Sequence, residues 1–584
     1  MKKVGWLVLS CLIILATVLT SCGEKAPEEI QTQSQTTTPV ETPKYGGLVN
    51  MIWNTDVRSF DDAFNMRSQT VAGLLSMEDL WEGDWSRGPA GTGEVGWSLT
   101  GFQGYEKFAR GRVAESWEIT GENKDTLVIH VRKGINFHNK PPTNGRQLTA
   151  DDVAFSINRQ FNTPTAFLGQ AFVHPISATA TDEWTVQVKY KSTADLLSEK
   201  QEIFNFMFIW PRDAVEANKN DMRDWRVNVG SGPFMISDYV KNSVISLVKN
   251  PNYWDKDPVG SGKGNKLPYL DEVKILIIQD VSTQQAAMRT GKGDQCAFTW
   301  EMATSLKNTN PELLMKKSVG VAQATGWVIK LRMNDQALPW ANIKVRQALH
   351  MAVDYQSIVD NYYGGNAVVY SFPAAALPES QDFFIPIAQL PANAKDLFTF
   401  NQAKAKQMLV DAGYGTGFDL EVVCRQNDVD LLSIYKDAWS KIGVNLVIDA
   451  KETGVYNSVA ADRAAKHALF AYANMNIPFY FQDFAGDQDG NMFIDDARVN
   501  QAVKDINEAA LDFAKQCKIY KDITPYILEQ AWIIPTPAYY QFNVWQPWLK
   551  NYHGELSVGN VERFLWAKWV WVDQDLKAKS VKPQ

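Results

Sequence analysis

Residues 113–156 decide the fold, beginning with Val113-Ala114-Glu115-Ser116-Trp117-Glu118-Ile119 and ending with Leu148-Thr149-Ala150-Asp151-Asp152-Val153-Ala154-Phe155-Ser156. Ser116 to Ile119 and Thr126 to Arg132 predict two strands, joined by a polar turn at Gly121, Asn123 and Asp125. In the second strand, alternate residues are apolar and share one face, as in a half-buried strand: Leu127, Ile129 and Val131. The stretch therefore predicts a β-hairpin.

Helix signals follow the hairpin. Thr149 can cap the first turn of a helix, with Asp152 as its reciprocal acidic partner, and the apolar residues at spacings of four predict a buried stripe: Val153, Ile157 and Phe161. Further helices are expected from about Ile343 to Tyr363, before Gly364-Gly365, and from Asn401 to Ala412, before Gly413. Short strands alternating with amphipathic helices indicate an α/β fold.

Composition excludes several classes of protein. The 584 residues include 58 Lys and Arg against 66 Asp and Glu, without a basic block, so no nucleic-acid partner is expected. The six histidines form no HExxH motif, and we expect no metal and no cofactor. Apart from Cys11 and Cys22, the chain has three widely spaced cysteines: Cys296, Cys424 and Cys517. They allow at most one disulfide, and the sequence does not determine whether they are reduced.

The first 22 residues are typical of a lipoprotein signal. Lys2 and Lys3 precede an apolar run from Val4 to Leu19, which at sixteen residues is shorter than the roughly 20 needed to span a membrane. The run ends at Leu19-Thr20-Ser21-Cys22-Gly23, which predicts cleavage and lipidation of Cys22. An uncleaved helical anchor is the alternative. Either interpretation places the body of the protein outside the cytoplasm, held to a membrane.

Residues 23–44 are rich in Gln, Thr, Pro and Glu and predict a disordered tether. Folded sequence is expected from Tyr45 onward. The remaining chain is too long for one hydrophobic core and suggests about three or four domain-sized units.

The order of these blocks resembles the extracytoplasmic solute-binding proteins of peptide-type ABC importers, family 5. The resemblance covers nearly the whole mature chain. Besides the strands and the helix start above, it rests on the blocks Gly134-Ile135-Asn136-Phe137-His138, Gly230-Ser231-Gly232-Pro233-Phe234, Lys249 to Trp254, Leu267 to Asp271, Thr283 to Asp294, Val345 to Leu349 and Ala352-Val353-Asp354.

The resemblance implies a two-lobed periplasmic-binding-protein-like (class II) fold with a ligand cleft between the lobes. Its first lobe would combine a core, formed by residues 45–85, 225–300 and 530–584, with an extra subdomain at 86–224. Residues 301–529 would form the second lobe. Crossings near Trp300 and near Ile533-Ile534-Pro535 would act as the hinge.

The function implied is that of a monomeric, lipid-anchored binding protein. It would capture an oligopeptide or similar organic solute by closing its lobes and deliver it to an ABC permease. Alternatives are an oligosaccharide or other neutral solute, a metal chelate, or a role in chemosensing. A hydrolase is disfavoured, because Ser231 lies in Gly-Ser-Gly before Pro233 and not in a GxSxG elbow.

Family members that bind peptides carry an acidic residue in a segment matching Ala471 to Pro478, where this chain has Asn474. A neutral amide does not compensate a buried ammonium, although Asp483 or Asp487 could. From this segment we select Tyr472, Asn474 and Asn476 as candidate ligand contacts. Arg463 could receive a ligand carboxylate, or could be a solvated helix-end residue.

Aromatic content gives further candidates, since the chain contains 20 Trp. Trp81, Trp85 and Trp97 lie in or beside a Gly-rich stretch, and Trp53 follows the first predicted strand; each could stack on a ligand or pack in the core. Near the C-terminus, Trp566, Trp569 and Trp571 suggest strand packing.

Residues 487–491 are similar in composition to a calcium loop, but their spacing does not fit an EF-hand. The alternative is a polar turn before a helix beginning near Ala497.

Overall fold

The computed structural model describes residues 41–64, 72–97, 103–171, 173–318, 327–369, 376, 380–472, 492–509, 511–559 and 562–581. The chain divides into two compact units, residues 1–42 and 43–584, and all the sheets belong to the second. The predicted signal with Cys22 and the tether before residue 41 lie outside the described residues.

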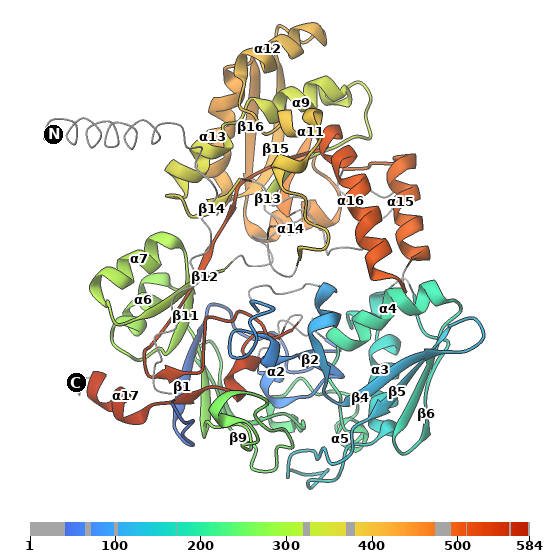
Figure 1. Cartoon of the computed structure of the whole chain (residues 1–584), viewed down its shortest axis with the longest axis vertical. Coiled ribbons are helices and arrows are strands. Elements are labelled where there is room, and N and C mark those ends of the chain that lie inside the picture. Colours follow the sequence, from blue (N-terminus) through green and yellow to red (C-terminus); the bar gives the residue numbers. More distant parts are fainter. Residues whose placement is uncertain are drawn as a thin grey trace, which may run out of the picture. The chain divides into compact units, whose positions relative to one another are not determined.

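A seven-stranded sheet forms the core of the first lobe (Figure 1). Its order is β12 (Leu314–Ser318), β20 (Gln541–Trp545), β11 (Gln295–Phe298), β1 (Leu48–Trp53), β10 (Glu272–Ile277), β9 (Val244–Lys249) and β8 (Phe234–Val240). β1 runs parallel to β10 and β11, and the other pairs are antiparallel. We call this sheet, together with the four-stranded sheet below, lobe I.

The four-stranded sheet is antiparallel, in the order β4 (Ala114–Thr120), β5 (Thr126–Val131), β7 (Thr185–Lys189) and β6 (Ser177–Asp182). The predicted hairpin is confirmed: β4 and β5 pair with Trp117 opposite Ile129. The helix signal is also confirmed, because α3 (Ala150–Asn162) begins after Thr149, whose backbone N–H donates to Asp152 Oδ2 at 3.1 Å. α3 buries its predicted stripe against β6 and β7.

The second sheet, which defines lobe II, has the order β16 (Val444–Lys451), β15 (Phe418–Arg425), β17 (Ala468–Tyr472), β13 (Trp327–Leu331) and β18 (Ile533–Pro535). β15 is parallel to β16 and β17, whereas β13 is antiparallel to β17 and β18. Two helices pack on its strands, α13 (Val429–Ser440) on β16 and α14 (Thr453–Ala461) on β15.

The helix predictions for lobe II are partly confirmed. α12 (Gln402–Asp411) is capped by Asn401, and α15 (Ala497–Glu508) by Asp496. The prediction of a single helix from Ile343 to Tyr363 is wrong, because α9 (Ile343–Met351) ends at Met351 and a second helix begins after Asp354. There the Asp354 carboxylate accepts from the Ser357 N–H at 3.0 Å and begins α10 (Tyr355–Ser357).

The remaining elements are α2 (Gly73–Ser76), β2 (Trp81–Gly83), β3 (Ala109–Gly111), α4 (Thr193–Asn205), α5 (Arg212–Ala217), α6 (Val281–Arg289), α7 (Trp300–Thr309), β14 (Ala367–Val368), α11 (Ala392–Asp396), α16 (Phe513–Gln530), β19 (Ala538–Tyr539), β21 (Leu549–Lys550), β22 (Trp571–Val572) and α17 (Gln574–Ser580). Short 3-10 helices include η3 (Gln103–Phe108) and η12 (Leu565–Lys568).

Strand pairing shows which sheet each strand near the predicted crossings joins. β12, which ends at Ser318, pairs in the lobe I sheet, whereas β13, which begins at Trp327, pairs in the lobe II sheet. β18 also pairs in the lobe II sheet, and it is followed by β19, which pairs with β14. Hydrogen bonds between strands far apart in the chain decide these pairings, and local patterns do not reveal them.

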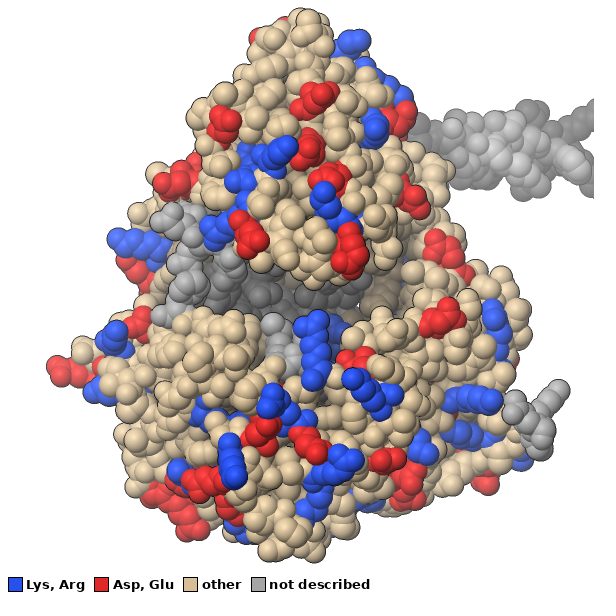
Figure 2. Space-filling view, turned by 180° about the vertical axis from the view of Figure 1, so that it is seen from behind, with Lys and Arg blue, Asp and Glu red and all other residues tan. Residues whose placement is uncertain are grey.

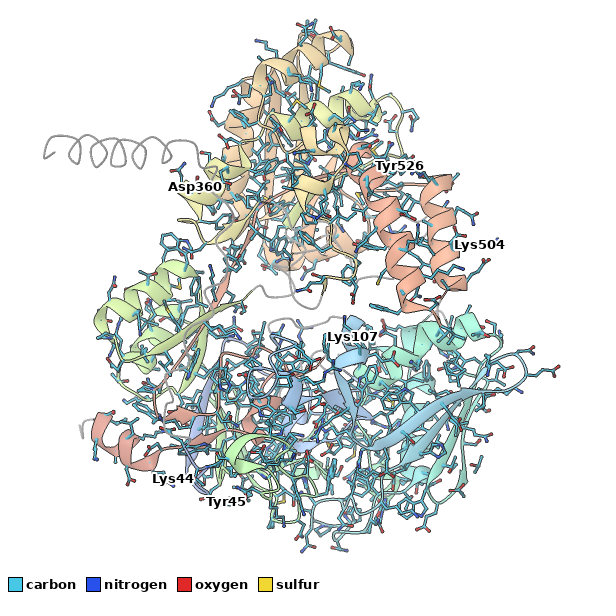
Figure 3. The ribbon with its side chains drawn as sticks, in the orientation of Figure 1. Lys44, Tyr45, Lys107, Asp360, Lys504 and Tyr526 are labelled. Atoms are coloured by element: carbon cyan, nitrogen blue, oxygen red, sulfur yellow. The ribbon has the colours of Figure 1, made fainter. Side chains whose placement is uncertain are left out.

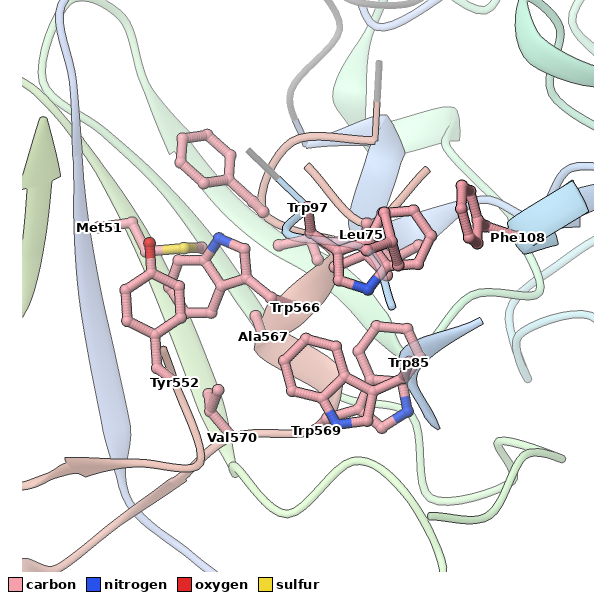
Figure 4. Packing of buried hydrophobic residues seen from close by; sticks show 14 of the residues in the cluster. Met51, Leu75, Trp85, Trp97, Phe108, Tyr552, Trp566, Ala567, Trp569 and Val570 are labelled. Carbon is pink, nitrogen blue, oxygen red and sulfur yellow. The ribbon is translucent and has the colours of Figure 1, made fainter. Parts of the chain in front are cut away.

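Aromatic side chains fill the core of lobe I (Figure 4). The rings of Trp85 and Trp569 stack 4.8 Å apart with their planes 2° from parallel. Trp566, Trp569 and Trp571 are all buried, but only Trp571 lies in a strand, because Trp566 belongs to η12. The three tryptophans are buried as packing residues, but they do not lie in one continuous strand. Trp85, Val95 and Trp97 belong to this same cluster of buried residues.

Cys296, Cys424 and Cys517 are free and buried. Burial raises the pKa of their thiols to about 12, 12 and 11, so they react slowly in the folded protein. Within the described ranges, no helix is both long and apolar enough to span a membrane. The same ranges contain no group of three His, Cys, Asp or Glu side chains placed to hold a metal ion.

Helix α4 carries a buried carboxyl group that makes stability depend on pH. Glu199 is 6% exposed, and its Oε2 has no hydrogen-bond partner among the described residues. Burial, assisted by Asp195, raises the pKa of Glu199 to about 7, and burial with Glu199 raises the pKa of Glu202 to about 8. The folded state therefore holds these protons more tightly than the unfolded chain does, so stability falls as the pH rises from the ordinary value of 4.5 to the raised values of about 7 and 8.

We expect Glu199→Gln to raise the free energy of unfolding at pH 8 by on the order of 2 kcal/mol and to leave it nearly unchanged at pH 5. Urea unfolding at both values measures the difference. The matched control is Glu508→Gln, whose carboxylate is 65% exposed. Equal effects of Glu199→Gln at the two pH values would contradict the assignment.

Candidate functional site

The carboxyl ends of parallel strands meet at one edge of the lobe II sheet. β15 ends there at Arg425 and β17 at Tyr472, while antiparallel β13 begins there at Trp327, which pairs with Tyr472. In open α/β sheets, ligands bind at the carboxyl ends of the strands. This edge is therefore the place in lobe II to look for ligand contacts.

Arg425 lies between two aromatic rings at this edge. Its guanidinium carbon is 4.6 Å from the ring centre of Trp327 and 4.6 Å from that of Tyr456. Both rings are fixed in turn: Trp327 stacks on Phe470 at 5.5 Å, and the Tyr456 hydroxyl donates to the Phe470 carbonyl at 2.7 Å. The guanidinium is thus held in one position before any ligand arrives.

No carboxylate pairs with the Arg425 guanidinium among the residues that the structure describes. Its Nε is buried without a hydrogen-bond partner. The nearby Asp428 accepts from the Arg425 backbone N–H at 3.0 Å, and burial raises the pKa of its carboxyl group although Arg425 opposes the shift. The half-buried guanidinium keeps donors that no described carboxylate occupies, and a ligand carboxylate could receive them through a bidentate contact.

The structure does not bring Arg463 to this edge. Arg463 follows α14, and its carbonyl accepts from Arg332 Nη1 at 2.7 Å. Arg332 comes directly after β13, whose last residue Leu331 pairs with Ala468, the first residue of β17. Arg463 therefore lies at the opposite end of β17 from Tyr472, as a helix-end arginine, and its selection as a ligand contact is not supported.

Trp53 is the lobe I candidate that keeps a partly exposed side chain. It ends β1, and its ring meets Phe564 edge-on at 5.3 Å, with the Arg563 guanidinium 5.2 Å from its centre. Because β1 runs parallel to β10 and β11, Trp53 lies at the carboxyl edge of the lobe I sheet. It stays a predicted ligand contact.

The other three selected tryptophans lie in the protein interior. Trp81, Trp85 and Trp97 are 4%, 0% and 0% exposed. Trp81 Nε1 donates to Asn205 Oδ1 at 2.8 Å, and its ring packs on Phe204. Because protein groups occupy their faces, the structure assigns these rings to packing, which was the alternative interpretation.

The segment that sequence analysis weighted most is described only at its start. The backbone of Tyr472 is placed at the end of β17, whereas Asn474, Asn476, Asp483 and the possible calcium loop at 487–491 lie outside the described residues. Arg425, the last residue of β15, was not among the predicted contacts. The strand before it mixes apolar residues with Asp419 and Glu421, and no local pattern singles out the arginine.

Residues 109–489 match the family described as "Bacterial extracellular solute-binding proteins, family 5 Middle". Relatives include "Heme-binding protein A" of Haemophilus influenzae, 27% identical over 75% of this chain and 81% of that protein. Another is "Dipeptide-binding protein" of Escherichia coli, 26% identical over 62% of this chain and 67% of that protein.

Solved structures share the fold. The substrate binding protein CtaP of Listeria monocytogenes superposes with a TM-score of 0.70 at 20% identity, covering 91% of this chain and all of that one. HbpA2 from Haemophilus parasuis gives 0.68 at 20% identity, covering 90% of this chain and all of that one.

The chain belongs to family 5 of the bacterial extracellular solute-binding proteins. It has their two-lobed fold, with a ligand cleft between the lobes, and it is a binding protein of ABC transport and not an enzyme. Ser231 agrees with this assignment, since its side chain is 1% exposed. Acidic and basic side chains are mixed over the face seen in Figure 2, as the small net charge leads one to expect.

Proposed function

We propose that this protein captures a small organic solute with a free carboxylate, with an oligopeptide as the leading class, by binding the ligand carboxylate at Arg425. The protein would be a monomer tethered to a membrane through lipidated Cys22, and it would deliver its ligand to an ABC permease. Closure of the lobes would signal occupancy, because a ligand touching both favours the closed state.

The observation that carries the proposal is the Arg425 guanidinium, which lies beside the rings of Trp327 and Tyr456 and forms no ion pair with a described carboxylate, although Asp428 is nearby. Trp53 would supply an aromatic contact from lobe I. Two relatives are named for dipeptide and heme, and both of these ligands carry carboxylates. An oligosaccharide is less favoured, because three of the four tryptophans proposed to stack on sugar rings are buried.

Thermal unfolding of residues 43–584, which form a compact unit, tests the ligand class. Four additions are compared: a dipeptide pool with free carboxylates, the same pool as carboxamides, an oligosaccharide pool, and heme. A ligand at about 100 times its dissociation constant adds roughly 2.7 kcal/mol to the folded state.

We expect free dipeptides or heme to raise the unfolding temperature, and carboxamides and sugars to leave it unchanged. Stabilisation by sugars alone would contradict the proposal that the ligand binds through a carboxylate. Equal stabilisation by acids and amides would also contradict it.

A further inference from the structure

Lys107, between Glu106 and Phe108 of lobe I, contacts residues that belong to lobe II. Residues 106–108 end η3 in lobe I, and Lys107 Nζ forms an ion pair with Asp382, which belongs to the part of the chain between β14 and β15. The same ammonium lies 4.9 Å from the ring centre of Phe108 and 5.8 Å from that of Phe513, the first residue of α16 (Figure 3).

The lobe I end of this contact is firmly held. Phe108 is buried in the lobe I core, with the Arg87 guanidinium 4.8 Å from its ring centre, and its carbonyl accepts from the Asp84 N–H at 2.8 Å. Glu106 accepts from Lys200 of α4 at 2.6 Å, in a pair whose lysine is nearly buried. η3 therefore moves with lobe I.

The lobe II end is tied to the return crossing. Phe383, next to Asp382, packs edge-on against Tyr520 of α16 at 5.6 Å. α16 carries Tyr526 (Figure 3), whose hydroxyl donates to Asp496 Oδ2 at the start of α15 at 2.7 Å. After α16 the chain passes directly into β18, the last strand before it returns to lobe I. A displacement at the start of α16 therefore also moves β18, where the chain returns to lobe I.

We propose that Lys107, Asp382 and Phe513 form an interlobe latch that favours the conformation in which the lobes touch, and so sets the cost of opening. The inference rests on the proposed function only in that lobe closure serves ligand capture. The Lys107 and Asp382 side chains are 38% and 48% exposed, so the pair is worth a modest amount and weakens with salt. A weak latch suits a binding protein that must reopen to release its ligand.

The test measures the distance between the lobes without ligand, in residues 43–584, so that its outcome does not depend on the ligand class. Spin labels are attached at Lys191→Cys in lobe I and Lys406→Cys in lobe II, both exposed positions. The three native cysteines are buried with raised thiol pKa values and so compete poorly for the label. Double electron-electron resonance then measures the distribution of distances between the two labels, from which the populations with the lobes close together and far apart follow.

We expect Lys107→Met and Asp382→Asn each to shift the ratio of long to short distances by about twofold to fivefold toward the long ones. The double variant should shift it no further than Lys107→Met does alone, because that change already removes the contacts of the ammonium with both Asp382 and Phe513. The control is Lys504→Met on α15, whose ammonium is exposed and forms an ion pair with Glu508 of its own helix. Unchanged distances in both single variants would overturn the latch, and so would an equal shift in Lys504→Met.

Discussion

Replacing Arg425 with methionine should weaken binding of the carboxylate ligand, as identified by the thermal unfolding comparison above, by about 100-fold or more. Methionine can still pack between Trp327 and Tyr456, so the pocket keeps its aromatic walls and loses only the charge and the hydrogen-bond donors. Removing one partner of a hydrogen-bonded charge pair in a binding site costs about 2 to 5 kcal/mol, or roughly 30-fold to several thousand-fold in affinity, a range that includes this loss. Isothermal titration calorimetry measures it.

Arg425→Lys separates charge from geometry. An ammonium keeps the positive charge but loses the planar fork that stacks between two rings and grips a carboxylate with two hydrogen bonds. We expect an intermediate loss. Arg463→Met is the matched control, since Arg463 lies at the other end of β17 and its loss should change affinity less than about twofold. A larger effect at Arg463 than at Arg425 would reverse the assignment of the two arginines.

Replacing Lys568 with methionine should lower the free energy of unfolding by about 3 to 5 kcal/mol, because it leaves buried carboxylates without their cation. Lys568 is fully buried, and its Nζ donates to Glu82 Oε2 at 2.6 Å and to Asp255 Oδ2 at 3.2 Å. Burial acts to raise the pKa of Asp255, but the positive charges of Lys568 and Arg110 outweigh it and lower this pKa to about 2. These contacts join the C-terminal η12 to strand β2 and to the loop after β9.

Urea unfolding at pH 7 measures this loss, with Lys504→Met as the exposed control. The destabilisation should shrink at acid pH, where Glu82 and Asp255 can take up protons once their cation is gone. A loss below about 1 kcal/mol at neutral pH would mean that Arg110 and Arg112 compensate both carboxylates by themselves.

Local patterns predicted much of lobe I. The hairpin of β4 and β5 follows from apolar alternation on both sides of a polar turn, and the start of α3 follows from Thr149 and Asp152, which cap each other within four residues. The family blocks are similarly short. Each of these features depends on contacts between near neighbours in the chain, which a sequence displays directly.

The features that were missed depend on distant parts of the chain. β12 joins the lobe I sheet only through β20, more than two hundred residues later. Trp85 is buried because Trp569 covers its ring, and no loop pattern around residue 85 indicates this. Arg425 stands out only once Trp327 and Tyr456 are seen on either side of it.

The measurement that tests the central claim most directly is a cycle of four calorimetric titrations. A ligand with a free carboxylate and its carboxamide are each titrated into the wild-type protein and into Arg425→Met. If Arg425 receives the carboxylate, the amide should bind the wild type about 100-fold more weakly than the acid does, and the two ligands should bind the variant almost equally. The same acid-to-amide ratio in both proteins would contradict the account.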